Sequence, residues 1–217
     1  MMIAVDGRMS HIQAVFWDLG GVIIRTEDRT WRAAWEARLG LPPGELDQLV
    51  FAGEMGRKAA IGQGGAEDVW TWVAERLGLD AEQRADLRRD FWRGEVLDLD
   101  LVGYIRGLRA NYRTGLISNA WREIRKDIEV EWRIADAFDK LIISAEVGLA
   151  KPDPRIYRLA LEGLDVEPAQ AIFVDDFTEN IEAASALGMH TVHFENRTQA
   201  QQQVESLLKW HPTQNPS

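Results

Sequence analysis

The chain has no cysteine, no long apolar run and fewer basic than acidic residues. Without cysteine it can form neither disulfide bonds nor thiolate metal sites, which fits a reducing compartment. No stretch approaches the roughly 18 apolar residues that a membrane-spanning helix needs. Residues 1–13 also lack the apolar segment of a secretory signal. We therefore expect a cytoplasmic protein without membrane segments.

Positive charge is too scarce for a broad nucleic-acid footprint. The 25 Lys and Arg residues face 35 Asp and Glu residues, giving a formal net charge of −10. Such a protein repels polyanions and anionic membranes as a whole. It can still bind a small phosphorylated ligand where a metal ion or a lysine supplies positive charge locally. We expect no nucleic-acid partner and look for such a local site.

The length and composition are those of a globular α/β domain with a modest insertion. The chain has 217 residues, of which 46% are hydrophobic and 28% charged, enough apolar residues for a real core. Residues 1–11 resemble a loose leader, and Met9-Ser10 is an alternative start that intact-mass measurement would test. The tail from His211 is expected to be disordered.

Short apolar strands alternate with helical patterns over most of the chain. This order predicts a parallel sheet covered by helices on both faces, that is, a three-layer Rossmann-like α/β core. We assign residues 10–26 and 96–200 to this core and residues 201–217 to the end of the last helix and the tail. Strands are expected at 12–17, 114–117, 140–143, 171–174 and 191–194, and helices after 119 and at 155–163, 178–187 and 198–209.

Residues 27–95 show helical rather than strand periodicity. Four helices are expected, and we identified no convincing strand, so this segment is predicted to be a small all-helical cap domain. Five of the nine tryptophans lie here, and their amphipathic spacing favours core packing over a substrate-facing or dimer-forming surface. The loop at 62–65 is either a plain helix connection or a mobile specificity loop.

Polar clusters follow three of the predicted strands. They are Asp18, Ser118-Asn119 and Asp175-Asp176, and Lys151 lies in the loop after a fourth strand. Ligands of open parallel sheets bind at the carboxyl ends of the strands, where these residues would converge. Carboxylates suit Mg²⁺, while small donors and a lysine suit a phosphate. The sequence therefore predicts a magnesium-dependent phosphoryl-transfer site.

The same segments carry a resemblance to a known family. The chain resembles the haloacid dehalogenase superfamily, in the branch whose helical cap lies between the first and second motifs. The four motifs occur in the family's order between residue 12 and about residue 194. They are the segments 15–22, 116–119, 151–154 with Tyr157, and 173–176 with Asn180.

The resemblance implies roles for individual residues. Asp18 would be the nucleophile, and Lys151 would bridge it to the phosphate. Ser118 and the amide of Asn119 would hold the phosphate.

The resemblance also implies a set of Mg²⁺ ligands. Asp18, the backbone carbonyl of Gly20 and Asp175 would bind the ion. Asp176 would bind it through water or orient the lysine. Asn180 would support these groups from behind.

Gly20 departs from the family's phosphatase pattern. Phosphatases of this family usually carry an aspartate here, two residues after the nucleophile, as acid and base for the leaving group. That help is typically worth about 10²–10⁴ in rate. The substitution favours substrates with good leaving groups, such as sugar 1-phosphates or acyl phosphates, or a replacement acid from the cap or from water.

We therefore expect a Mg²⁺-dependent phosphatase that hydrolyses a small phosphorylated metabolite through a phosphoaspartyl intermediate. Two rivals stay open: a non-catalytic phosphate-binding or interaction protein, and a metal-independent 2-haloacid dehalogenase. Dehalogenases of the family usually lack the paired acids seen at Asp175-Asp176. The sequence leaves the choice between monomer and homodimer open.

Overall fold

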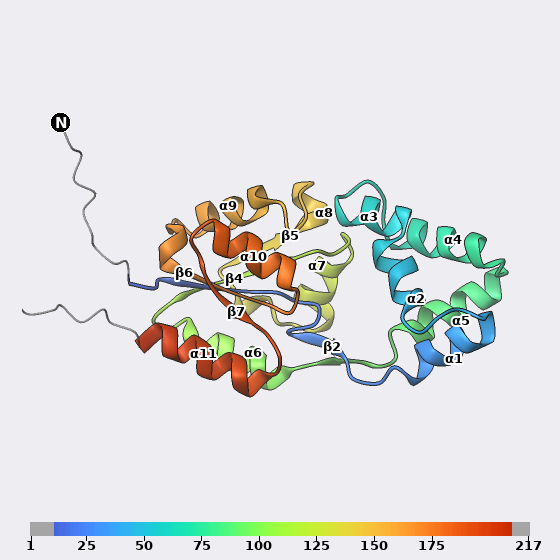
Figure 1. Cartoon of the computed structure of the whole chain (residues 1–217), viewed down its shortest axis with the longest axis horizontal. Coiled ribbons are helices and arrows are strands. Elements are labelled where there is room, and N and C mark those ends of the chain that lie inside the picture. The colour runs from blue at the N-terminus through green and yellow to red at the C-terminus, as the bar shows by residue number, and fades with distance from the viewer. Residues whose placement is uncertain (1–10, 210–217) are drawn as a thin grey trace, which may run out of the picture.

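The computed structural model describes residues 11–209, so the predicted start at Met9 and the predicted disorder from His211 lie outside the described residues. A five-stranded parallel sheet runs through the larger part of the molecule (Figure 1). Its order is β5-β4-β1-β6-β7. The strands are β1 (Ala14–Trp17), β4 (Arg113–Ser118), β5 (Lys140–Ile143), β6 (Ala171–Asp175) and β7 (His190–His193).

Helices cover both faces of this sheet, which confirms the three-layer α/β prediction (Figure 1). Because side chains alternate along a strand, β1 points Val15 and Trp17 to one face and Ala14 and Phe16 to the other. The first face packs against α6 (Leu99–Leu108) and α11 (Arg197–Lys209). The second packs against α9 (Pro154–Gly163) and α10 (Thr178–Ala186).

Short helical segments connect several of these elements. After β4 come α7 (Ile124–Lys126), a π-helical segment (Asp127–Glu131) and a 3-10 turn (Ala135–Ala137). α8 (Ser144–Val147) follows β5, and a second 3-10 turn (Pro168–Gln170) precedes β6. The helices α6 and α8 were not predicted.

Residues 30–91 form a helical module with its own hydrophobic core, beyond the carboxyl ends of the sheet strands (Figure 1). Glycines in left-handed conformation end α1 at Gly40 (φ 68°) and α4 at Gly78 (φ 65°), where the sequence predicted helix ends. The segments are α1 (Thr30–Leu39), α2 (Glu45–Asp47), a π-helical segment (Gln48–Ala52), α3 (Glu54–Ala60), α4 (Ala66–Leu77) and α5 (Ala81–Phe91).

Two short strands join the module to the sheet domain. β2 (Ile24–Thr26) and β3 (Glu95–Leu97) pair antiparallel, so the chain leaves and re-enters the sheet domain side by side. The expectation that residues 27–95 hold no strand was wrong at Glu95. Each strand has only three residues and neither is fully buried, so no alternation of apolar and polar residues indicated either strand in the sequence. The domain boundaries at 26, 95 and 200 stay a prediction.

Asp98 ties this two-stranded junction to the sheet domain. Its carboxylate caps α6 by accepting from Leu101 N at 2.9 Å. It also accepts from Arg25 of β2 at 2.9 Å and from Arg197 of α11 at 2.7 Å. Burial raises the pKa of Asp98, but these donors outweigh it and hold the pKa below its usual 3.8. The charged form of Asp98 therefore stabilises the fold.

We expect Asp98→Ala to lower the free energy of unfolding by about 2–4 kcal/mol, through the lost cap and two charged hydrogen bonds. The stabilisation is present above the unfolded pKa near 3.8 and is lost as pH falls through the lower folded pKa. Urea unfolding should therefore show a gap between wild type and variant that narrows below pH 3.8. Asp100→Ala removes an exposed partner of Arg197 and should change stability by less than about 1 kcal/mol. A gap independent of pH would contradict this account.

Candidate functional site

Asp18, Lys151 and Asp175 meet at the carboxyl edge of the sheet. Asp18 follows β1, Asp175 ends β6, and Lys151 lies in the loop before α9. The Lys151 ammonium contacts Asp18 Oδ1 at 2.8 Å and Asp175 Oδ2 at 2.6 Å. All three side chains are buried. The structure thus brings together three residues that are far apart in the sequence, as the strand-end argument predicted.

Burial and mutual repulsion make the carboxylates hard to ionise together. Burial raises the pKa of Asp18 to about 7; Lys151 opposes this rise, and Asp175 and Asp176 add to it. Burial, with the charge of Asp175, raises the pKa of Asp176 to about 6. The single ammonium of Lys151 therefore faces three carboxylates. Further positive charge among these carboxylates would reduce their mutual repulsion.

The acidic cluster fits a hard divalent cation. Asp18, Asp175 and Asp176 each offer an oxygen within 4.8 Å of the others. Asp176 Oδ1 is buried and has no hydrogen-bond partner among residues 11–209. Oxygen donors at this spacing suit Mg²⁺, which needs only one or two carboxylates besides water and phosphate.

Asp175 is held from three sides. Phe177 N donates to its Oδ1 at 2.8 Å, and the Asn180 amide donates to both oxygens at 3.0 and 3.1 Å. Lys151 donates to Asp175 rather than to Asp176, so the predicted orienting role falls on a different acid. Asn180 lies behind the carboxylate, in the position expected of a supporting residue.

The loop after β4 holds the lysine loop in place. Asn119 Nδ2 donates to Lys151 O, and Lys151 N donates to Asn119 Oδ1, both at 2.8 Å. This paired contact uses the side chain of Asn119, whereas the sequence argument used only its backbone amide. Ser118 is buried at the end of β4, beside β1 in the sheet order and on the same edge as Asp18. Its predicted phosphate contact stays a prediction.

Tyr157 is a member of the site that the sequence argument quoted without assigning a role. It is fully buried, stacks edge-on against Phe173 and donates to Asn180 O at 3.1 Å. As the fourth residue of α9, Tyr157 thus contacts the backbone of Asn180, whose side-chain amide holds Asp175. The spacing of Tyr157 from Lys151 was the sequence signal for this residue, but only the structure shows which atom its hydroxyl contacts.

The two glycines after Asp18 differ in what they allow. Gly21 has φ 78°, and a Cβ there would lie 2.1 Å from Asp176 Oδ2, so any side chain would displace that carboxylate. A Cβ at Gly20 would meet nothing within 4 Å. The site therefore requires glycine at residue 21 but has room for a side chain at residue 20.

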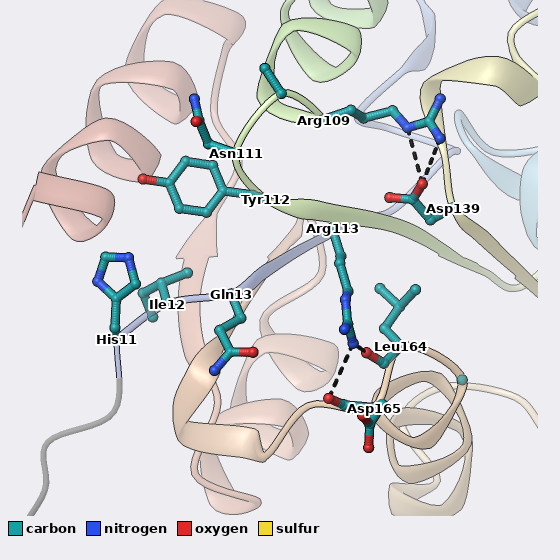
Figure 2. A pocket seen from close by; sticks show the side chains of 12 residues that line it. His11, Ile12, Gln13, Arg109, Asn111, Tyr112, Arg113, Asp139, Leu164 and Asp165 are labelled. Carbon is teal, nitrogen blue, oxygen red and sulfur yellow. Dashed lines mark hydrogen bonds and ion pairs between the residues drawn. The ribbon is translucent and has the colours of Figure 1, made fainter.

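A cavity of about 690 Å³ lies at the opposite edge of the sheet, before β1 and β4 (Figure 2). Its two arginines are already engaged. Arg109 pairs with Asp139 at 2.5 Å, and Arg113 donates to the backbone oxygens of Leu164 and Asp165. The cavity is remote from the acidic cluster. Its arginines hold neighbouring segments of the fold together through these contacts.

Among the similar proteins are three kinds of hydrolase. The chain is 28% identical to D-ribitol-5-phosphate phosphatase of Bacteroides thetaiotaomicron, covering 91% of this chain and 98% of that protein. It is 27% identical to bifunctional epoxide hydrolase 2 of Sus scrofa, covering 95% of this chain but only 40% of that protein. It is 31% identical to (S)-2-haloacid dehalogenase 1 of Pseudomonas sp. (strain CBS-3), covering 58% of this chain and 59% of that protein.

Solved structures share the fold at low identity. A HAD-like family hydrolase from Porphyromonas gingivalis superposes with a TM-score of 0.74 at 22% identity, covering 93% of this chain and all of that chain. A HAD family enzyme of Bacteroides thetaiotaomicron, solved with magnesium and inorganic phosphate, has a TM-score of 0.68 at 22% identity, covering 83% and 93%.

A family model gives the assignment directly. Its match, described as a haloacid dehalogenase-like hydrolase, spans residues 12–188 and so contains all four motifs and the helical module. Within the described residues, no helix is long and apolar enough to cross a membrane. The chain belongs to the haloacid dehalogenase-like hydrolase family.

Proposed function

We propose that this hydrolase cleaves small phosphate monoesters in a magnesium-dependent reaction that passes through a phosphoaspartyl intermediate on Asp18. The single observation that carries the proposal is the meeting of three acids and one lysine, with one buried acid oxygen that has no hydrogen-bond partner in the described part of the chain. Displacement of a halide from carbon does not need a cluster of carboxylates that can bind a cation. A phosphate, in contrast, brings negative charge that a cation must offset.

The first step is attack by Asp18 on phosphorus. Leu19 N and the Lys151 ammonium both donate to Oδ1, at 2.7 and 2.8 Å, which fixes the carboxylate and leaves Oδ2 as the attacking atom. The new bond joins Oδ2 to phosphorus, and the bond from phosphorus to the ester oxygen breaks, with its electron pair going to the leaving group. Water then attacks phosphorus, and the bond from phosphorus to Oδ2 breaks with its electron pair returning to the Asp18 carboxylate. A proton of the attacking water passes to the phosphate that is released or to solvent.

The remaining residues position charge. Asp18, Asp175 and the backbone oxygen of Gly20 would hold Mg²⁺, with Asp176 close by. When bound, the ion would offset the charge of the phosphoryl oxygens. Lys151 stabilises Asp18 before attack and the transferred phosphoryl group during it, and Ser118 at the end of β4 would donate to a phosphate oxygen.

Because residue 20 is a glycine, the rate of hydrolysis should depend strongly on the leaving group. With no acid two residues after Asp18, the departing oxygen leaves as an anion or takes a proton from water. We infer that esters with stabilised leaving groups, such as aryl, acyl and sugar 1-phosphates, are cleaved faster than simple alkyl phosphates. The relative named D-ribitol-5-phosphate phosphatase and the magnesium–phosphate complex of the Bacteroides enzyme support phosphate as the ligand.

The helical module would close over the site. It lies beyond the edge that carries Asp18, and it joins the sheet domain through β2 and β3 (Figure 1). Closure around a bound ester would exclude water during attack by the aspartate. In this role residues 27–95 act as the predicted cap, and the partner of the site is a small phosphorylated metabolite.

A phosphate-release screen over many metabolites, with Mg²⁺ and with EDTA, tests the function. We expect release from some esters with Mg²⁺ and a return to background with EDTA. Halide release from a 2-haloacid that is indifferent to EDTA would instead establish a dehalogenase. Phosphate binding without any release would establish the non-catalytic alternative.

A further inference from the structure

Aromatic side chains bridge the helical module and the sheet domain beside the candidate site. Trp121 lies in the loop after β4, three residues beyond Ser118. Its ring centroid is 6.0 Å from that of Phe51, which belongs to the module, and 6.3 Å from that of Trp92, which directly follows the module's last helix. The segment that carries the two candidate phosphate ligands, Ser118 at the end of β4 and Asn119 in the following loop, thus leads directly to an aromatic surface.

Two of the three rings are exposed although they are apolar, while Trp121 is partly buried against the core of the module. Phe51 is 45% exposed and Trp92 38%, while Trp35 is buried, as its helical spacing predicted, and Trp70 is buried as well. A second aromatic residue is exposed near the acids: Phe177 follows Asp176 directly and is 61% exposed. Large aromatic rings that are exposed to solvent next to the candidate site indicate a binding surface rather than a hydrophobic core.

The part of the surface around Phe51 offers few groups that could hydrogen-bond a polar ligand, whereas Trp92 also lines a pocket with the charged residues Glu67, Arg84 and Arg88. The chain around Phe51 reads Leu-Val-Phe-Ala-Gly over residues 49–53 and carries no polar side chain. A sugar placed against it would leave hydroxyl groups without partners, at a cost that an apolar group avoids. Its chemistry therefore fits a flat or branched hydrocarbon.

We propose that Phe51, Trp92 and Trp121 form an apolar subsite that binds the leaving group, so that the substrates are phosphate esters of aromatic or other hydrophobic alcohols. This inference rests on the proposed phosphatase function and narrows it. The three rings are referred to below as the aromatic wall. The phosphate would lie on the lysine and acid side and the hydrocarbon against the aromatic wall, where contact with the rings adds affinity. An aryl or otherwise stabilised leaving group also suits the glycine at residue 20.

The test is a series of phenyl, 4-methylphenyl, 4-propylphenyl and 4-pentylphenyl phosphates with Mg²⁺. The leaving phenols are nearly equally acidic, so only the apolar contact changes along the series. We expect KM to fall about threefold per added methylene group, with kcat nearly constant, because the wall contacts ester and transition state alike. Phe51→Ala should flatten this gradient, and Phe51→Leu should keep most of it.

Trp31→Ala is the matched control. Trp31 is also 38% exposed but stacks on Arg93, outside the aromatic wall, so its loss should leave the gradient intact. A KM that does not change along the series, while phosphate is still released, would overturn the subsite and leave the phosphatase standing.

Two further outcomes separate the subsite from the activity. If no ester releases phosphate, the proposed hydrolysis fails. Quenching of tryptophan fluorescence that strengthens with chain length would then still support the subsite, and its absence would refute it. If sedimentation shows a dimer that Phe51→Ala dissociates, and KM is flat, the aromatic wall is a contact between copies of the chain.

Discussion

Asp18→Asn should lower phosphate release by on the order of 10⁴-fold or more, because an amide oxygen cannot attack phosphorus and form the covalent intermediate. The same change should leave the metal-free protein equally or more stable. It removes one of three clustered carboxylates, two of them buried, that lie around a single ammonium, and Lys151 keeps its 2.6 Å contact with Asp175. Loss of activity with an unchanged or raised Tm is the pattern expected of an active-site group.

The measurements are kcat with an aryl phosphate and a thermal melt in EDTA. Asp136→Asn serves as the control, since this exposed carboxylate pairs with Arg106 on the surface and should leave both quantities almost unchanged. Mass spectrometry of wild type quenched during turnover should show a phosphoryl group on Asp18 that the variant lacks. A variant that retains even a tenth of the wild-type rate would rule out Asp18 as the nucleophile.

The fold and the centre of the site were predictable for one shared reason. Polar residues that end apolar strands must gather at one edge once the sheet is parallel, so Asp18, Lys151 and Asp175 could be placed together from the sequence alone. Their separation along the chain did not matter, because the carboxyl ends of parallel strands lie along the same edge of the sheet.

What could not be predicted depends on contacts between distant segments. Nothing in the sequence pairs Asn119 with the backbone of Lys151, and nothing indicates that Lys151 contacts Asp175 rather than Asp176. β2 and β3 were missed because three-residue strands carry too little pattern to be recognised.

The tryptophans show the limit of periodicity most clearly. Spacing on a helix correctly indicated that Trp35 is buried, but the same spacing grouped Trp31 with it, and Trp31 is 38% exposed. It could not indicate that Trp92 remains exposed and meets Trp121 from the sheet domain, because that contact depends on how the two parts pack. Periodicity indicates which face of a helix is apolar, whereas a binding surface also depends on the segment that packs beside that helix.

Gly20→Asp should raise kcat for alkyl phosphates by about 10²-fold and change it little for esters of acidic phenols. The structure has room for the side chain, since a Cβ at residue 20 meets nothing within 4 Å. The neighbouring acids of the cluster would raise the pKa of the new carboxyl group, which keeps part of it protonated and able to donate to the leaving oxygen.

Gly20→Asn is the matched control, because the amide has nearly the same size but is not an acid. The measurement is kcat across phosphate esters of increasing leaving-group pKa, at saturating Mg²⁺. Wild type and Gly20→Asn should both slow steeply along this series, and Gly20→Asp should slow much less. If wild type already cleaves alkyl and aryl phosphates equally fast, another group supplies the proton, and the absence of an acid at residue 20 does not shape the choice of substrate. If Asp and Asn act alike, the gain comes from filling space rather than from proton transfer.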